Sequence, residues 1–188
     1  MSYVRHINLF LVATVLALLG ACATPIDPPD QRATKIDLLA RDILQLSPNI
    51  EQEEAYRFAK VAVEAAAGLG TKYEVTLAPW LHNASIITGL KDRGLCYEYA
   101  RDLYESLKHV DNEHLSMHFV KANQGKLNEH HALAVTVKGA TWDTGVLLDA
   151  WRGGGNLYFM PIKSDKKYPW LLENRDASFA SASNRFVQ

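Results

Sequence analysis

The chain has 188 residues, of which 48% are hydrophobic and 22% are charged. This composition is that of an ordinary globular protein, and the length suits one domain with one sizeable core. The formal net charge is -1 and the basic residues are scattered, so the chain lacks the electrostatic footprint of a nucleic-acid-binding protein. We therefore expect no nucleic-acid partner.

The chain opens with a segment that predicts secretion. Residues 1–21 have a short polar start with Arg5, then the apolar run Ile7–Leu19, and they end on Gly20 and Ala21. This is the pattern of a signal peptide, and the apolar run is too short for a comfortable membrane span. We therefore expect residues 1–21 to be a signal peptide that the mature protein has lost.

The end of this segment predicts a membrane anchor. The stretch Leu19-Gly20-Ala21-Cys22 resembles the bacterial lipobox, in which the cysteine is lipidated and becomes the first mature residue. The resemblance implies that acyl chains on Cys22 hold the protein on a membrane surface. Ala23 stands where an aspartate would be the usual signal for inner-membrane retention, which implies the outer membrane and its periplasmic face. A plain signal peptide, which would leave a soluble periplasmic protein, is the alternative.

The mature chain divides into three predicted regions. Residues 22–33 are rich in proline and aspartate, so they predict an extended, lipidated tether that forms no packed element. Residues 34–170 are expected to form the one folded domain. Residues 171–188 are rich in alanine, serine and asparagine and are expected to be a flexible tail.

Two scaffold helices are expected at the start of the domain. Apolar residues recur at helical spacing from Ile36 to Leu44, and the pattern stops at Ser47-Pro48. A second helix is predicted over residues 51–67, ended by Gly68 and Gly70. An irregular segment, residues 71–91, then leads to a cysteine.

Cys96 follows a glycine-marked turn and is expected to begin a helix. Apolar residues recur at steps of three and four from Cys96 to Leu107, which predicts an amphipathic helix. The unpaired N–H groups and the positive dipole end of such a helix favour an anion, so they are expected to lower the thiol pKa. If Cys22 is lipidated, Cys96 is a lone thiol in an oxidising compartment. Cys96 is therefore a candidate nucleophile, and its alternative is a small buried hydrophobic residue.

Strands are predicted after this helix, over residues 115–122, 131–137, 145–151 and 156–160. Helices followed by an antiparallel sheet indicate the α+β class. If the strands on either side of Ala140 pair symmetrically, His131 lies opposite Asp149. A bulge at residues 142–144 would shift this register, and a slip of one residue would turn Asp149 to the other face.

A cysteine on a helix, a histidine at a strand start and an aspartate near the end of the next strand suit thiol acyl transfer. The thiolate attacks a carbonyl, the imidazolium protonates the leaving amine, and the carboxylate orients the ring. Cys96, His131 and Asp149 occur in that order. The sequence thus predicts them as nucleophile, acid and base, and orienting residue.

At these residues the chain resembles the transglutaminase-like group of the papain-like superfamily, and in particular the bacterial transglutaminase-like cysteine proteinases. Three motifs of the family have matches in this chain. The helix start matches at Gly94, Cys96, Tyr99 and Ala100, and the strand start matches at His131-Ala132. The aspartate after an apolar strand matches in Leu147-Leu148-Asp149-Ala150-Trp151. The resemblance covers about Trp80–Phe159. It implies a fold in which a helix bearing the cysteine packs against an antiparallel sheet bearing the histidine and the aspartate.

Several assignments stay open. His130 is the alternative base, and Asp143 competes with Asp149, although its turn-like neighbours suit an ordinary solvated aspartate. Asn83 and His82 are candidate donors to an oxyanion, to which backbone N–H groups at Cys96 would add.

Metal binding is the rival chemistry. His114 and His118 are four residues apart, but the segment between them reads as a strand, which would hold them apart. We therefore expect no metal and no cofactor.

These patterns predict an envelope lipoprotein that hydrolyses or transfers an amide or peptide acyl group. A protein loop and the peptide stems of the cell wall, peptidoglycan, are both plausible substrates, and the sequence does not separate them. The alternative is a catalytically silent binding module of the envelope that keeps the fold.

Overall fold

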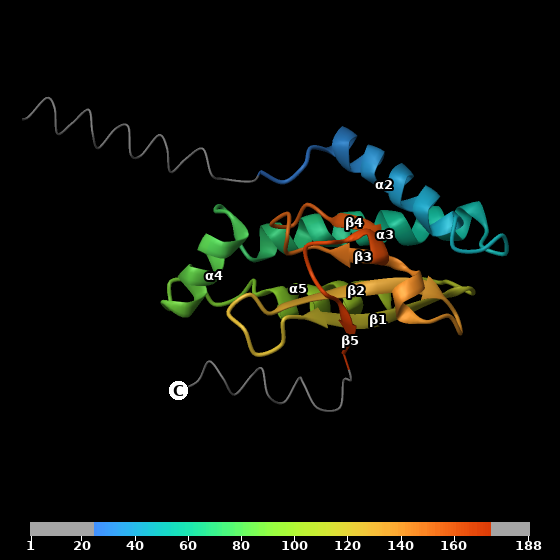
Figure 1. Cartoon of the computed structure of the whole chain (residues 1–188). Coiled ribbons are helices and arrows are strands. Elements are labelled where there is room, and N and C mark those ends of the chain that lie inside the picture. Colours follow the sequence, from blue (N-terminus) through green and yellow to red (C-terminus); the bar gives the residue numbers. More distant parts are fainter. Residues whose placement is uncertain (1–24, 174–188) are drawn as a thin grey trace, which may run out of the picture.

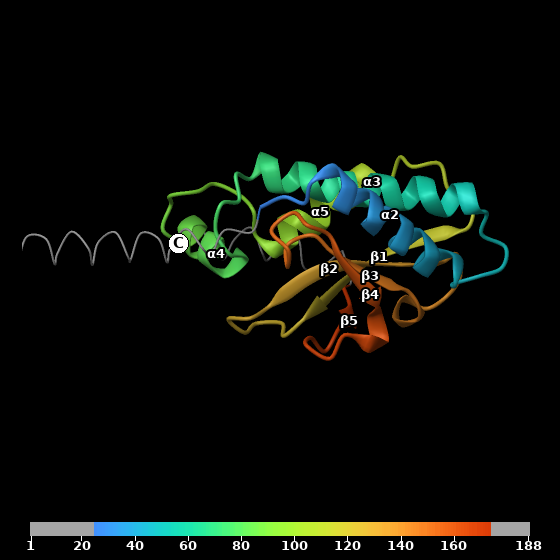
Figure 2. The same ribbon diagram turned by 90° about the horizontal axis from the view of Figure 1, so that it is seen from above.

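The computed structural model describes residues 25–173. The predicted signal peptide, Cys22 and residues 174–188 of the predicted tail lie outside the described residues. Within them, four α-helices precede a five-stranded antiparallel sheet, so the predicted α+β class is confirmed. Helices α2, α3 and α5 lie on one side of the sheet, as Figures 1 and 2 show.

The first helix begins earlier than expected. Helix α2 spans Pro29–Leu44, so the prediction of a tether without packed structure is wrong from Pro29 onward. A proline is tolerated in the first turn of a helix because its missing N–H would have no partner there. Upstream, the Asp27 N–H donates to Asn156 Oδ1 at 2.7 Å, so the chain already contacts the domain before α2 begins.

The second helix continues past the glycines that were expected to end it. Helix α3 spans Gln52–Lys72 and includes both Gly68 and Gly70. A Cβ atom on Gly70 would lie 2.6 Å from Ile26 Cδ1 and 2.9 Å from Gly155 Cα. Gly70 therefore allows α3 to lie close to the segments that contain Ile26 and Gly155, which a residue with a side chain would prevent.

The remaining helices flank the candidate nucleophile. Helix α4, Pro79–Ile87, lies in the segment that was expected to be irregular. Helix α5, Cys96–Leu107, has the predicted bounds and buries Tyr99, Leu103 and Leu107 against α3 and the sheet. Each fully buried leucine side chain contributes about 1.5–3 kcal/mol to the stability of this packing.

One antiparallel sheet has the strand order β4-β3-β2-β1-β5. Its strands are β1 (Leu115–Ala122), β2 (His130–Val137), β3 (Val146–Asp149), β4 (Tyr158–Pro161) and β5 (Leu171–Leu172). The four predicted strands are present, and β5 is an addition that lies in the predicted tail. The tail prediction is therefore wrong for residues 171–173, because β5 pairs with β1 and the Glu173 N–H donates to the Phe119 carbonyl at 2.9 Å.

The sheet has one core on each face. Leu133 and Val135 face the helices, whereas Ala132 and Ala134 belong to a smaller core on the other face. Between β4 and β5 the chain must cross three strands, and it does so over this second face, where Ile162 and Trp170 pack. This crossing segment brings Tyr168 and Trp170 over the start of β2.

Candidate active site

The turn before Cys96 is held by a histidine from α4. His82 Nε2 contacts the carbonyl oxygen of Arg93 at 2.9 Å and the ring is buried. Gly94 adopts a φ of 120°, and a Cβ atom there would lie 2.4 Å from His82 Nε2. Both the positive φ and the missing space require glycine. The turn thus places Cys96 at the first position of α5.

A buried glutamate caps the same helix. Glu98 Oε2 accepts hydrogen bonds from the N–H groups of Gly94 and Leu95 at 2.8 and 3.1 Å, and Oε1 accepts one from Arg93 Nε at 3.1 Å. The reasoning from sequence did not assign Glu98 this role. The signal was present, because a glutamate three residues after the N-cap position is one half of a capping box.

The thiol of Cys96 lies against the backbone at the start of β2. Its Sγ atom is 3.8 Å from the carbonyl oxygen of Glu129, and the residue is 8% exposed. Burial raises the thiol pKa to about 12, and the charge of Asp149 adds to this rise, against the lowering effect of the N–H groups of His131 and Tyr97. The expected lowering of the thiol pKa is therefore wrong in this conformation, because desolvation outweighs the helix N-terminus.

The predicted pairing of His131 with Asp149 is also wrong. Strand β2 pairs with β3 in the register Leu133 to Leu148, one residue away from the symmetric register about Ala140. Such a slip turns Asp149 to the other face of the sheet. There it meets His130, the alternative base, whose Nε2 lies 2.6 Å from Asp149 Oδ2.

The His130–Asp149 pair is fully enclosed. Their side chains are 2% and 0% exposed. The ring of His130 has three aromatic neighbours, with centroid distances of 4.9 Å to Trp151, 4.6 Å to Tyr168 and 5.4 Å to Trp170. Within the described part of the chain, His130 Nδ1 has no hydrogen-bond partner although it is buried. One nitrogen of the ring is thus fixed by a carboxylate and the other is available.

Arg152 also binds the carboxylate of Asp149. Arg152 Nε donates to Asp149 Oδ2 at 3.0 Å, and the Arg152 N–H donates to Oδ1 at 3.0 Å. Burial of Asp149 opposes its ionisation, but the charges of His130 and Arg152 prevail and its pKa is lowered. Arg152 Nη2 continues the chain of contacts to Asp165 Oδ2 at 2.7 Å. Asp149 is therefore ionised and fixed in position.

No family model, curated protein or solved structure matches this chain. The assignment of the site therefore rests on its own geometry.

His131, the predicted base, has a different role in the structure. Its Nδ1 lies 3.2 Å from Glu173 Oε2 and its Nε2 lies 3.1 Å from Glu129 Oε1. Burial alone would lower the pKa of His131, but the two carboxylates outweigh burial and raise it. His131 thus joins the loop before β2 to the residue that follows β5, and the two carboxylates favour its protonated form. Sequence reasoning missed Glu173 because it lies in the predicted tail.

The two oxyanion candidates separate in the structure. His82 is engaged with the Arg93 carbonyl, so it supports the turn. Asn83 Oδ1 accepts a hydrogen bond from Trp151 Nε1 at 3.1 Å. Because the Trp151 ring packs on His130, this contact holds Asn83 near the enclosed pair, with its amide nitrogen not used in the bond.

The competing assignments lie elsewhere. Asp143 contacts Thr141 and Lys163 in a turn, as expected for a solvated aspartate. His114 Nδ1 contacts Glu54 at 2.8 Å, and His118 Nε2 contacts Thr136 Oγ1 at 2.9 Å. Over residues 25–173, no group of three or more His, Cys, Asp or Glu side chains is arranged to hold a metal ion.

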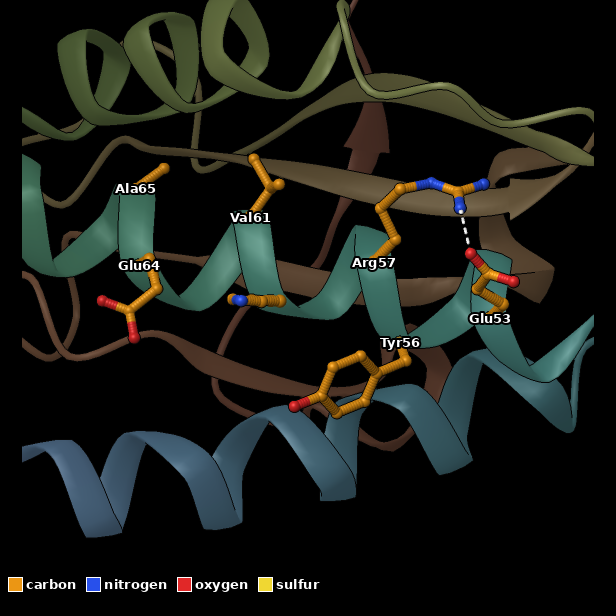
Figure 3. A pocket seen from close by; sticks show the side chains of 7 residues that line it. Glu53, Tyr56, Arg57, Val61, Glu64 and Ala65 are labelled. Atoms are coloured by element: carbon orange, nitrogen blue, oxygen red, sulfur yellow. Dashed lines mark hydrogen bonds and ion pairs between the residues drawn. The ribbon is translucent and has the colours of Figure 1, made fainter.

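A shallow groove of about 560 Å³ lies on the outer side of α3 and is formed by side chains of that helix alone (Figure 3). Glu53, Arg57, Lys60 and Glu64 give it a mixed charge, and it contains no thiol. In residues 25–173, no helix has the length and apolar character needed to cross a bilayer.

Proposed function

We propose that this protein is a lipid-anchored envelope protein of transglutaminase-like fold, with a thiol active site formed by Cys96, His130 and Asp149. It hydrolyses or transfers the acyl group of an amide, either in a protein loop or in a peptide of the cell wall. The observation that carries this proposal is the 2.6 Å contact between His130 Nε2 and Asp149 Oδ2, which leaves Nδ1 buried and, among residues 25–173, without a hydrogen-bond partner.

The surroundings of the thiol support the role of His130. Cys96 touches the backbone of both neighbours of His130, the Glu129 carbonyl at 3.8 Å and the His131 N–H. The charge of Asp149 acts on the thiol pKa, so the carboxylate and the thiol lie within one electrostatic environment. The His130 imidazole is held by Asp149 at Nε2, and its Nδ1 is the nitrogen that would take the thiol proton in the proposed site.

The proposed reaction proceeds in two halves. In the first, the Cys96 proton moves to His130 Nδ1 and the thiolate attacks the amide carbonyl. The Asn83 amide and the Cys96 N–H stabilise the oxyanion. Its collapse breaks the C–N bond, and His130 donates the proton to the leaving amine. In the second half, His130 takes a proton from water or from an acceptor amine, which attacks the thioester and releases Cys96. Asp149 keeps the ring oriented throughout and stays ionised. These steps need no metal or cofactor.

Burial of the thiol favours a second candidate function, a catalytically silent binding module of the envelope. A Cys96 thiol with a pKa of about 12 is protonated at neutral pH. An active enzyme would have to form the thiolate by proton transfer to His130, whereas a silent module would leave it protonated. The two functions therefore differ in the reactivity of one atom.

Alkylation of Cys96 by iodoacetamide at pH 6 tests the proposal. A thiol activated by His130 is expected to react quickly, whereas an ordinary thiol of pKa about 8.5 is only about 0.3% ionised at that pH. The Cys96→Ser variant gives the background labelling. If Cys96 of the parent protein is alkylated at pH 6 no faster than an ordinary, unactivated thiol, the proposed enzyme is contradicted and the silent module is favoured.

A further inference from the structure

The most exposed large apolar side chains lie in two neighbouring segments. Among residues 25–173, the four highest exposures are those of Trp80, Ile87, Leu90 and Leu127, at 67%, 68%, 78% and 111%. Three of them belong to α4 or directly follow it, and Leu127 lies in the loop between β1 and β2. Helix α4 also contains no Asp, Glu, Lys or Arg. An apolar surface of this kind marks an interaction site.

These two segments lie at the same end of the molecule. In Figures 1 and 2, α4 and the loop between β1 and β2 extend beyond the sheet on one side, with the start of α5 between them. The contacts agree, since Asn83 of α4 bonds Trp151, and Cys96 contacts Glu129 at the end of the loop. The exposed apolar side chains therefore lie on segments that adjoin the proposed site.

The described chain also begins at this end. The carbonyl of Pro25 accepts a hydrogen bond from Asn156 Nδ2 at 2.8 Å, and Asn156 lies in the turn that follows Trp151. Cys22 is three residues before Pro25 in the sequence, and three residues span at most about 10 Å. An acyl chain on Cys22 would therefore hold this end of the molecule within about 10 Å of the lipid, not the opposite end.

We infer that the exposed apolar side chains of α4 and the loop between β1 and β2 form a second membrane contact. Trp80, Ile87, Leu90 and Leu127 insert among the lipid headgroups beside the acyl anchor. A tryptophan suits this position because its ring has an apolar body and one polar N–H. Lys126, which precedes Leu127 and is exposed, suits anionic headgroups. This inference rests on the lipid anchor of the proposed function.

The contact would orient the enzyme. An acyl chain on a short connection leaves the domain free to rotate, whereas a second contact fixes one face toward the bilayer. The start of α5, which carries Cys96, then lies beside the membrane surface. The substrate of the proposed reaction is accordingly a peptide segment presented at the lipid surface.

Quenching of tryptophan fluorescence tests the contact. The acylated full chain is placed in vesicles of phosphatidylethanolamine and phosphatidylglycerol with brominated acyl chains, and its emission is compared with that in unbrominated vesicles. Because the chain has four tryptophans, insertion of Trp80 alone is expected to remove as much as one quarter of the emission. The Trp80→Phe variant, which keeps the apolar contact, is expected to show almost no quenching.

Matched substitutions sharpen the result. Leu90→Ser and Leu127→Ser are expected to lower the quenching of Trp80. Leu38→Ser, at an exposed leucine on α2, is expected to leave it unchanged.

Equal quenching in the parent and in Trp80→Phe overturns the inference while the anchor stands. The inference is also overturned if Trp80 is not quenched and α4 of one copy cross-links to α4 of another, because this surface would then be a dimer interface. The mass of the Cys22 peptide is measured separately, and an unmodified Cys22 overturns the anchor and this contact together.

Discussion

Replacing His130 by glutamine separates its proposed chemical role from its structural one. The amide nitrogen of glutamine can occupy the position of His130 Nε2, so the hydrogen bond to Asp149, 2.6 Å in the parent, has a replacement. The variant loses the ring that packs against three aromatic side chains and the nitrogen that would accept the Cys96 proton. We expect a loss of about 1–2 kcal/mol in the free energy of unfolding, within the usual range for one substitution.

The alkylation rate of the Cys96 thiol is expected to change much more than the stability. Without an imidazole to take its proton, Cys96 titrates at or above the ordinary pKa of about 8.5, and at pH 6 no more than about 0.3% of it is thiolate. If the parent forms a thiolate–imidazolium pair, the rate of alkylation by iodoacetamide at pH 6 should fall by about 100-fold or more. The assay is the alkylation rate as a function of pH, together with urea unfolding of each protein.

His131→Gln is the matched control. It removes an adjacent histidine that contacts Glu129 and Glu173 in place of Asp149. Its alkylation rate at pH 6 is expected to stay within a few-fold of that of the parent. The reasoning is refuted if His130→Gln reacts as the parent does while His131→Gln reacts slowly, because the base would then be His131.

Three further predictions concern residues around the site. Asp149→Asn is expected to lower turnover by about 10³–10⁴-fold through loss of the ring's orientation, measured as single-turnover acylation; an unchanged rate would contradict its role. Glu98→Ala removes the cap of α5 and is expected to cost about 0.5–2 kcal/mol in urea unfolding, with Glu105→Ala on the exposed side of the helix as control. The raised pKa of His131 predicts a pH dependence: its contribution to stability is complete below pH 6.5 and is lost as the pH rises through the raised value. The urea midpoint of the parent should therefore fall over that range, and that of His131→Gln should fall less.

Local patterns in the sequence were sufficient for the elements that carry the site. The bounds of α5 and β1 follow from their periodicities of 3.6 and 2, because an amphipathic helix and a half-buried strand each bury one set of positions. The same reasoning proposed Cys96 and Asp149 as candidate site residues, and it assigned the α+β class, which the structure confirms. It also kept His130 as an alternative, since the two adjacent histidines point to opposite faces of a strand.

Tertiary structure decided the features that depend on how elements meet. The register of β2 and β3 differs from the symmetric one by a single residue, a difference set by the turn at Trp142–Thr144 and by packing on both faces. This one-residue shift in register determines whether the Asp149 side chain contacts His130 or His131. Gly70 is likewise read as a helix end by local rules, and only the approach of Ile26 and Gly155 explains why the helix continues.

The pKa shifts of the site residues were the features that the sequence predicted least well. A cysteine at a helix N-terminus is expected to have a lowered thiol pKa, but the surrounding chain buries Cys96 and reverses the direction. Glu173, more than forty residues from His131 in sequence, supplies one of the two carboxylates that raise the pKa of His131. Periodicity, a local property of the backbone, is thus written in the sequence, whereas burial and charge contacts arise only when distant segments pack together.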